Sequence, residues 1–194
     1  MFKIAVLVSG GGTNLQSIIE NIINGKLNCI IGAVIADRPC YAIERAKEQE
    51  IEGILVDRKV YKERLFDEID RILSYKKVDL IVLAGFLSIL DSDFVNKWKN
   101  RIINIHPSLL PKHGGKGLYG IKVHESVIRS GDKESGCTVH YVDTGIDSGD
   151  IIIQAKVPVL PDDTPDALQK RVLVEEHKIL PLAINKIIGE IPKE

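Results

Sequence analysis

The sequence predicts an α/β fold: a single domain on a mostly parallel twisted sheet of about seven strands, flanked by helices, with a Rossmann-like N-terminal half. Two observations predict it. Short apolar runs alternate with segments whose apolar residues recur at helical spacing, and the first run ends in a glycine turn. The last two strands, 135–142 and 151–157, are joined so closely that we expect them to be antiparallel. The domain is expected to span residues 1–194.

The N-terminal half is predicted to alternate strand and helix. Its first run, Phe2–Val8, is apolar throughout, as in a strand buried on both faces of a parallel sheet. A helix follows from Leu15, with apolar residues at helical spacing. Further strands are expected at 28–36, 53–56 and 80–84, and further helices at 41–49, at 61–75 and in a short segment capped by Asp91 that runs to Trp98.

The C-terminal half is predicted to start with a strand at 101–103. The segment 112–120 is rich in glycine, and it reads either as a mobile loop with His113 and Lys116 free to reach a ligand or as a surface turn. A helix at 121–129 is expected to carry His124 on its surface, and a final helix is expected from about 166 to 188.

Composition bounds the class of protein. The 26 basic and 27 acidic residues nearly balance, which argues against a surface that coats nucleic acid. No apolar run approaches the roughly 20 residues of a membrane span. The three cysteines, Cys29, Cys40 and Cys137, are isolated, so neither a zinc site nor a disulfide framework is indicated, and a cytoplasmic location is expected.

The turn Ser9–Asn14 after the first strand is typical of an anion site, because backbone N–H groups at a helix N-terminus attract phosphate. A dinucleotide site is one alternative, with Asp37 after the second strand in the place of the ribose-binding acid. The third glycine of that fingerprint is missing, because Leu15 stands there, so a single phosphate fits better. A tight turn that uses glycine only for its geometry is the other alternative.

The segment Asn104–Pro111 carries the candidate chemistry. Asn104 and His106 are two residues apart on a strand, so their side chains share a face. An amide donor beside a group that titrates near neutrality suits a reaction that forms an oxyanion and moves a proton. The alternative is a strand-end histidine that is satisfied by the backbone.

Five motifs together resemble the folate-dependent formyltransferases. They are Ser9–Leu15, Ala84–Phe86, Asn104–Pro111, Gly136–His140 and Asp147–Gly149, in the order of that family. The string N-x-H-P-S-L-L-P is the most specific of them, and the resemblance runs from Lys3 to about Glu190.

The resemblance implies formyl transfer from 10-formyltetrahydrofolate, as co-substrate, to the amine of glycinamide ribonucleotide in purine synthesis. It implies direct transfer without a metal, and small-molecule substrates rather than nucleic acid or membrane, in a monomer or homodimer. Branches of the family with a further C-terminal domain or an N-terminal regulatory domain are not expected, nor is an acceptor that is water or a sugar amine. A non-catalytic nucleotide-binding module is the alternative from another class.

The resemblance also implies roles for single residues. Asn104 would donate to the oxyanion, His106 would stabilise it and move protons, and Asp147 would orient His106 and favour its charged form. Asp147 could instead form only an Asx turn before Gly149. His140 is expected to give structural support, and a metal site of His106, His140 and Asp147 is conceivable but not favoured.

Two sets of binding residues follow from the same resemblance. The ribonucleotide set is Gly11, Gly12, Thr13, Asn14 and Glu176. The folate set is Arg58, Leu87, Ser88, Ile89, Leu90, Asn104, Asp143, Thr144, Gly145 and Asp147. Ser88 stands where many members have arginine.

Overall fold

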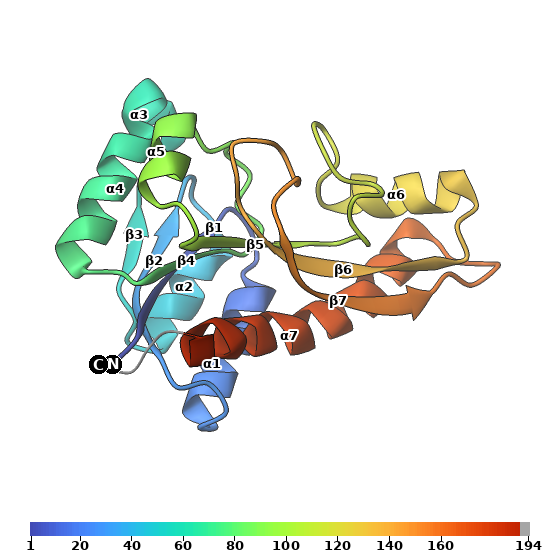
Figure 1. The fold of residues 1–194 in the computed structure, drawn as a ribbon, viewed down its shortest axis with the longest axis horizontal. Helices are drawn as coiled ribbons and strands as arrows, with labels where there is room; N and C mark the ends of the chain where they lie inside the picture. Colours follow the sequence, from blue (N-terminus) through green and yellow to red (C-terminus); the bar gives the residue numbers. More distant parts are fainter. Residues whose placement is uncertain (191–194) are drawn as a thin grey trace. The chain divides into compact units, whose positions relative to one another are not determined.

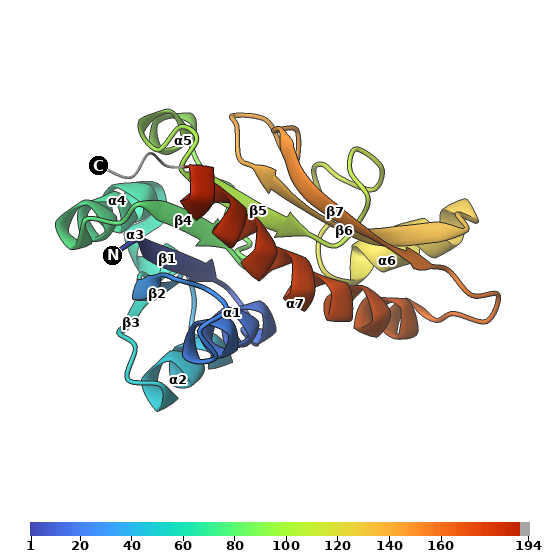
Figure 2. The ribbon, with the colours of Figure 1, turned by 60° about the horizontal axis from the view of Figure 1, so that its bottom comes forward.

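The computed structural model describes residues 1–190, and its seven strands there follow the order β3-β2-β1-β4-β5-β6-β7 (Figures 1 and 2). The pairs β1–β2, β1–β4 and β2–β3 are parallel, and β6–β7 is antiparallel. The predicted fold class is therefore confirmed. The chain separates into two compact units, Met1–Ile103 and Asn104–Glu194.

The first unit is built on four parallel strands. They are β1 (Lys3–Val8), β2 (Ile30–Ala36), β3 (Gly53–Leu55) and β4 (Leu80–Leu83). In β1 and β4 nearly every side chain is buried, because helices cover both faces of this sheet. Figures 1 and 2 show α1 (Thr13–Ile23) and α2 (Tyr41–Glu48) on one face and α4 (Leu65–Lys76) and α5 (Ser92–Lys97) on the other.

The helix predicted at 61–75 is wrong at its N-terminus. The structure has a short helix α3 (Arg58–Tyr61), a 3₁₀ turn η1 (Lys62–Arg64) and only then α4. Lys62 adopts φ 48°, a conformation that no α-helix contains, so the helical run breaks there. The predicted cap is confirmed, since the Asp91 carboxylate accepts a hydrogen bond from the Phe94 N–H at 2.7 Å.

The second unit follows β5 (Ile102–His106), in which the chain crosses from one unit to the other. It holds the antiparallel pair β6 (Glu134–Tyr141) and β7 (Ile151–Pro158), with Thr138 opposite Gln154. The helix α6 (Ile121–Ser130) precedes β6, and the long helix α7 (Pro165–Glu190), red in Figure 1, packs along β6 and β7. His124 on α6 is buried, so its predicted surface position is wrong.

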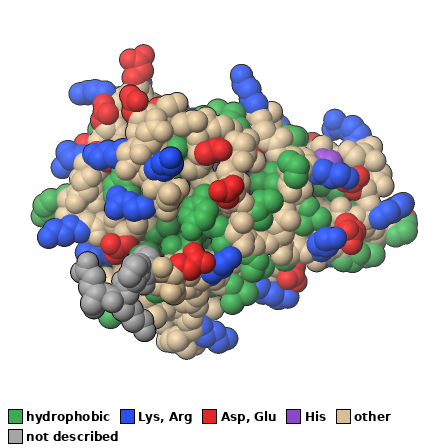
Figure 3. Space-filling view, viewed as in Figure 1, with side chains coloured by type: hydrophobic (Ala, Val, Ile, Leu, Met, Phe, Trp, Pro, Cys, Tyr) green, Lys and Arg blue, Asp and Glu red, His purple; other side chains and the backbone are tan. Residues whose placement is uncertain are grey.

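The surface carries mixed charge. On the face drawn in Figure 3, acidic and basic side chains are interspersed, and neither sign dominates that face. Within residues 1–190 the structure contains no helix with the length and apolar character that crossing a membrane requires.

Candidate active site

The catalytic candidates lie in the second unit, where β5 ends. Asn104 is half-buried, and the His106 side chain is almost fully buried. The structure brings both together with Asp147, which comes from the connection between β6 and β7. The predicted constellation is thus assembled from residues more than 40 positions apart in the sequence.

The two ring nitrogens of His106 have different surroundings. Nε2 lies 3.0 Å from the backbone carbonyl oxygen of His113. A carbonyl can only accept, so Nε2 carries the hydrogen. Nδ1 lies 3.6 Å from Oδ2 of Asp147 and is therefore the nitrogen left for a substrate. The backbone does satisfy one nitrogen, as in the alternative considered above, but it leaves the other beside a carboxylate.

His140 fixes the orientation of the Asn104 amide. His140 Nδ1 donates to the Tyr141 carbonyl at 2.8 Å, and Nε2 lies 3.1 Å from Nδ2 of Asn104. Burial lowers the pKa of His140, against opposing effects that include the Tyr141 hydrogen bond and the Asp147 charge. The neutral ring accepts at Nε2, so Asn104 donates one amide hydrogen to His140 and keeps the other for a ligand.

Asp147 joins two loops. It has φ 55°, and its Oδ2 accepts from the Gly115 N–H at 2.9 Å, while Oδ1 lies 3.8 Å from His140 Nε2. The Asx-turn alternative for Asp147 is not what the structure shows, because the observed donor belongs to the 112–120 segment. Asp143 instead caps this loop, accepting from the Gly145 N–H at 3.0 Å and the Ser148 hydroxyl at 2.7 Å.

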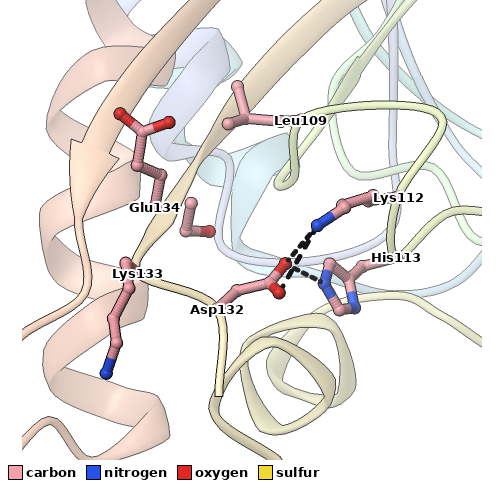
Figure 4. A pocket seen from close by; sticks show the side chains of 7 residues that line it. Leu109, Lys112, His113, Asp132, Lys133 and Glu134 are labelled. Carbon is pink, nitrogen blue, oxygen red and sulfur yellow. Dashed lines mark hydrogen bonds and ion pairs between the residues drawn. The ribbon is translucent and has the colours of Figure 1, made fainter. Parts of the chain in front are cut away.

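His113 is not free to reach a ligand, contrary to one of the two readings of the 112–120 segment. Its Nε2 lies 3.1 Å from Asp132 Oδ2 (Figure 4). Its Nδ1 lies 2.9 Å from Ser126 Oγ. Lys116 is exposed.

His124 adds a second buried imidazole close to His106. Burial, followed by the charge of His106, lowers the pKa of His124 to about 4. Its Nδ1 has no hydrogen-bond partner among the described residues. His124 therefore stays neutral at physiological pH.

The glycine loop of the first unit is shaped for close approach. Gly12 precedes α1 with φ 72°, and a Cβ there would lie 2.7 Å from the Ala42 Cβ. The loop is held to α2, because the Ala42 N–H donates to the Gly10 carbonyl and Arg45 Nε donates to the Gly11 carbonyl at 2.7 Å. Thr13 and Asn14 begin α1 directly after it, so backbone N–H groups of the first helical turn face outward along the axis.

Asp37 is not placed to bind a ribose. It is fully buried, and it accepts from Ser9 Oγ at 2.6 Å, Ser88 Oγ at 2.5 Å and the Arg38 guanidinium at 2.8 Å. Burial raises its pKa, but the hydrogen bonds from Arg38, Ser88 and Ser9 together outweigh burial and hold the pKa below its ordinary value. Because the Ser9 hydroxyl also accepts from the Leu87 N–H at 2.8 Å, Asp37 links the glycine loop to the loop after β4.

The remaining predicted binding residues divide between the two units. In the first, Arg58 is exposed at the start of α3, and Leu87 and Ile89 are 42% and 67% exposed. In the second, Thr144 is exposed beside Asp143, and Glu176 is buried on α7. Glu176 lies close enough to β6 that its charge adds to burial in raising the pKa of Cys137 to about 12.

Sequence reasoning missed Ser9, Arg45 and Asp132 as supports of these sites. Ser9 stood within a recognised motif, but Arg45 and Asp132 lie in helical and turn segments with no pattern of their own. Among residues 1–190, no group of three or more His, Cys, Asp or Glu side chains is arranged to hold a metal ion.

Comparison with known proteins gives a consistent result. The family model described as "Formyl transferase" matches residues 2–184. The phosphoribosylglycinamide formyltransferase of Haemophilus influenzae is 42% identical over 95% of this chain and 86% of its own length. The trifunctional purine biosynthetic protein adenosine-3 of Drosophila melanogaster is 40% identical over 96% of this chain, which spans only 14% of that protein.

Solved structures agree. Glycinamide ribonucleotide transformylase 1 from Symbiobacterium toebii superposes with a TM-score of 0.92 at 38% identity, covering 100% of this chain and 91% of the other. Phosphoribosylglycinamide formyltransferase from Bacillus halodurans superposes with a TM-score of 0.90 at 35% identity, covering 97% and 96%.

Proposed function

We propose that this chain, a member of the formyl transferase family as its motifs predict, transfers the formyl group of 10-formyltetrahydrofolate to the amine of glycinamide ribonucleotide. The products are the formylated ribonucleotide and tetrahydrofolate. One observation favours a catalytic role for this chain over that of a non-catalytic binding module. It is the arrangement of Asn104, His106 and Asp147, in which one amide hydrogen of Asn104 and Nδ1 of His106 make no hydrogen bond to the described residues.

The reaction begins when the amine of the ribonucleotide attacks the formyl carbon. A carbon–nitrogen bond forms, and the carbonyl electron pair moves to the oxygen. The second amide hydrogen of Asn104 donates to that oxyanion, and a donor already in place need not reorganise. His106 Nδ1 takes the proton that the attacking amine loses, and the resulting imidazolium also donates to the oxyanion. Asp147, 3.6 Å from Nδ1, stabilises the imidazolium by electrostatic attraction.

Collapse of the tetrahedral species breaks the bond to the folate nitrogen. The oxyanion returns its electron pair to carbon, the folate nitrogen leaves with the bonding electrons, and it takes up a proton. The attacking amine has lost a proton, so no net proton is consumed. His106 would carry this proton between the two nitrogens through Nδ1, which makes no hydrogen bond to the described residues.

Substrate binding follows the two predicted sets. The ribonucleotide phosphate would lie at Gly11–Asn14, where the N-terminus of α1 favours an anion, with Glu176 as a second contact. The pterin would use the exposed apolar surface of Leu87 and Ile89 and backbone groups of residues 87–90 and 143–147. Arg58, with its exposed cationic side chain, would meet the folate tail.

We further infer that the two units act together as one formyltransferase domain, as a monomer or homodimer in the cytoplasm, on small molecules alone. The unpaired state of Cys29, Cys40 and Cys137 supports a reducing compartment.

The test is turnover of 10-formyltetrahydrofolate, followed by absorbance of the released folate, with and without glycinamide ribonucleotide. We expect turnover only with the ribonucleotide, and a loss of at least ~100-fold in His106→Ala. The variant His106→Gln is the sharper probe, because it keeps a donor to the His113 carbonyl and removes Nδ1; we expect it to be as inactive as His106→Ala. Turnover without the ribonucleotide would indicate hydrolysis, and near wild-type activity in His106→Ala would contradict the catalytic assignment.

A further inference from the structure

The orientation of His106 depends on a backbone carbonyl that is itself in an unusual position. His113, whose carbonyl lies 3.0 Å from His106 Nε2, has φ 54°. A residue with a Cβ seldom adopts this left-handed conformation without support from its surroundings. The carbonyl that faces His106 therefore has to be held in place by other contacts.

The His113 side chain supplies one of those contacts. Figure 4 shows the ring and the Lys112 side chain pointing toward Asp132 from the same turn. His113 Nε2 lies 3.1 Å from Asp132 Oδ2, and Lys112 Nζ lies 3.1 Å from the same oxygen. A carboxylate only accepts, so His113 Nε2 carries a hydrogen, and in the neutral ring Nδ1 accepts from the Ser126 hydroxyl at 2.9 Å.

The backbone of the same turn is fixed from its other side. The Ser108 hydroxyl donates to the Lys112 carbonyl at 2.6 Å, and the Lys112 N–H donates to the Leu109 carbonyl. Asp132 therefore anchors two consecutive side chains of a turn whose next carbonyl faces the catalytic imidazole.

We propose that Asp132 is a positioning residue for formyl transfer: it holds Lys112 and His113 so that the His113 carbonyl keeps the hydrogen of His106 on Nε2 and leaves Nδ1 for the substrate. This inference rests on the proposed function, because it matters only if His106 is the catalytic imidazole. Asp132 touches neither substrate nor reacting atoms, and it acts through His113.

The charge of Asp132 suits this role. Hydrogen bonds from His113 and then Lys112 lower its pKa, so the carboxylate stays ionised over the working pH range of an enzyme. A charge-assisted hydrogen bond is stronger than a neutral one, and an amide in its place would hold the ring less firmly.

A neighbouring acid provides a matched control. Asp132 and Glu134 line the same cavity of ≈320 Å³, but Glu134 pairs with Lys156 at 3.0 Å and not with the turn. In Figure 4 the Glu134 side chain points away from His113. Glu134→Gln thus removes an acid of the same cavity without touching the proposed linkage.

The experiment compares Asp132→Asn with Glu134→Gln in the full chain. We expect Asp132→Asn to lower kcat roughly tenfold, with both KM values within about twofold, because a misoriented catalytic group affects the chemical step rather than binding. Nitrogen-15 shifts of the His106 ring provide a readout independent of activity, and they should show a loss of the pure Nε2–H tautomer. Glu134→Gln should match the wild type in kcat and in these shifts.

His113→Gly separates anchoring from backbone shape. Glycine keeps the carbonyl and adopts φ 54° without strain, so the variant removes only the ring with its contacts to Asp132 and Ser126. We expect the same loss of kcat and of the tautomer as in Asp132→Asn. Wild-type kcat and tautomer in His113→Gly would overturn the proposal even if Asp132→Asn proved to be poorly folded.

The catalytic role of His106 and the positioning role of Asp132 can be tested separately. If His106→Ala is inactive while Asp132→Asn behaves as Glu134→Gln does, the positioning role is wrong and the proposed function stands. If His106→Ala is active, the catalytic assignment fails, and the positioning role fails with it.

Discussion

At the scale of single residues, hydrogen bonds decide the chemistry by assigning protons to imidazoles. His106 keeps a hydrogen on Nε2 because a carbonyl faces it, and His140 keeps one on Nδ1 for the same reason. The two rings are thereby used in opposite senses: His106 presents Nδ1 to a ligand, whereas His140 presents a lone pair to Asn104. If each ring carried its hydrogen on the other nitrogen, His106 would not present Nδ1 to a ligand and His140 would not accept from Asn104.

Stability should depend on pH through His124. The pKa of its buried ring is about 4 in the folded state and about 6.5 when unfolded, so between these values the unfolded chain binds a proton that the folded chain does not. Stability is therefore lost as pH falls from about 6.5 to 4. We expect His124→Gln to lose less stability than the wild type over this pH range, by up to roughly 3 kcal/mol of unfolding free energy. Urea unfolding at several pH values measures the difference. If the unfolding free energies of the variant and the wild type changed in parallel with pH, the low pKa of His124 would be contradicted.

The sequence identified Asn104, His106 and Asp147 because they stand in specific strings, but it did not identify the groups that orient them. Asp132 reaches the site only through a folded turn, and the roles of the two nitrogens of His106 depend on a carbonyl seven residues away. Such hydrogen bonds between separate segments leave no local sequence pattern. The buried position of His124 was missed because a single polar residue on a short helix does not reveal which face is covered.

At the scale of elements, the glycine loop before α1 is constrained both by its backbone conformation and by its packing against α2. Gly12 needs a left-handed φ and has Ala42 against the place where a Cβ would be, whereas Gly10 has neither restriction. Motif recognition alone could not separate the two glycines, since both belong to the same run.

We expect Gly12→Ala to destabilise the protein by about 1–3 kcal/mol, since it combines backbone strain with a steric clash against α2. The matched variant Gly10→Ala has open space and should lie within roughly 0.5 kcal/mol of the wild type. Urea unfolding of both proteins measures the difference. Equal urea midpoints for the two variants would show that the loop accommodates a Cβ at position 12 without loss of stability.

Most element boundaries were predictable because apolar periodicity reflects which face is buried. The strand expected at 80–84 and the helix expected at 41–49 end within one residue of β4 and α2. The break at Lys62 was not predictable, because a positive φ at a lysine is imposed by the tertiary context rather than by propensity.

At the scale of the whole molecule, we expect the units Met1–Ile103 and Asn104–Glu194 to unfold together. If they form one domain, as we propose, unfolding should be a single cooperative transition. The chain carries natural probes for both: Trp98, the single tryptophan, is buried in the first unit, and Cys137 is buried in the second.

We expect Trp98 fluorescence and thiol labelling of Cys137 to give the same urea midpoint, in a Cys29→Ala, Cys40→Ser background that leaves one thiol. The pKa of Cys137, about 12, makes it unreactive until its unit unfolds, so labelling reports unfolding directly. Fluorescence of the unsubstituted chain controls for the background. Two separated midpoints would show two independently folding units.

The burial of two of the three thiols, Cys29 and Cys137, also affects how the protein withstands oxidants. Peroxide attacks thiolates, and burial raises the pKa of Cys29 and Cys137 to about 12, while Met1, the single methionine, stands at the chain terminus. The proposed chemistry uses an amide, an imidazole and a carboxylate, none of which needs a reduced sulfur atom. Formyl transfer by this protein should therefore continue under an oxidative burst that silences enzymes with a cysteine nucleophile.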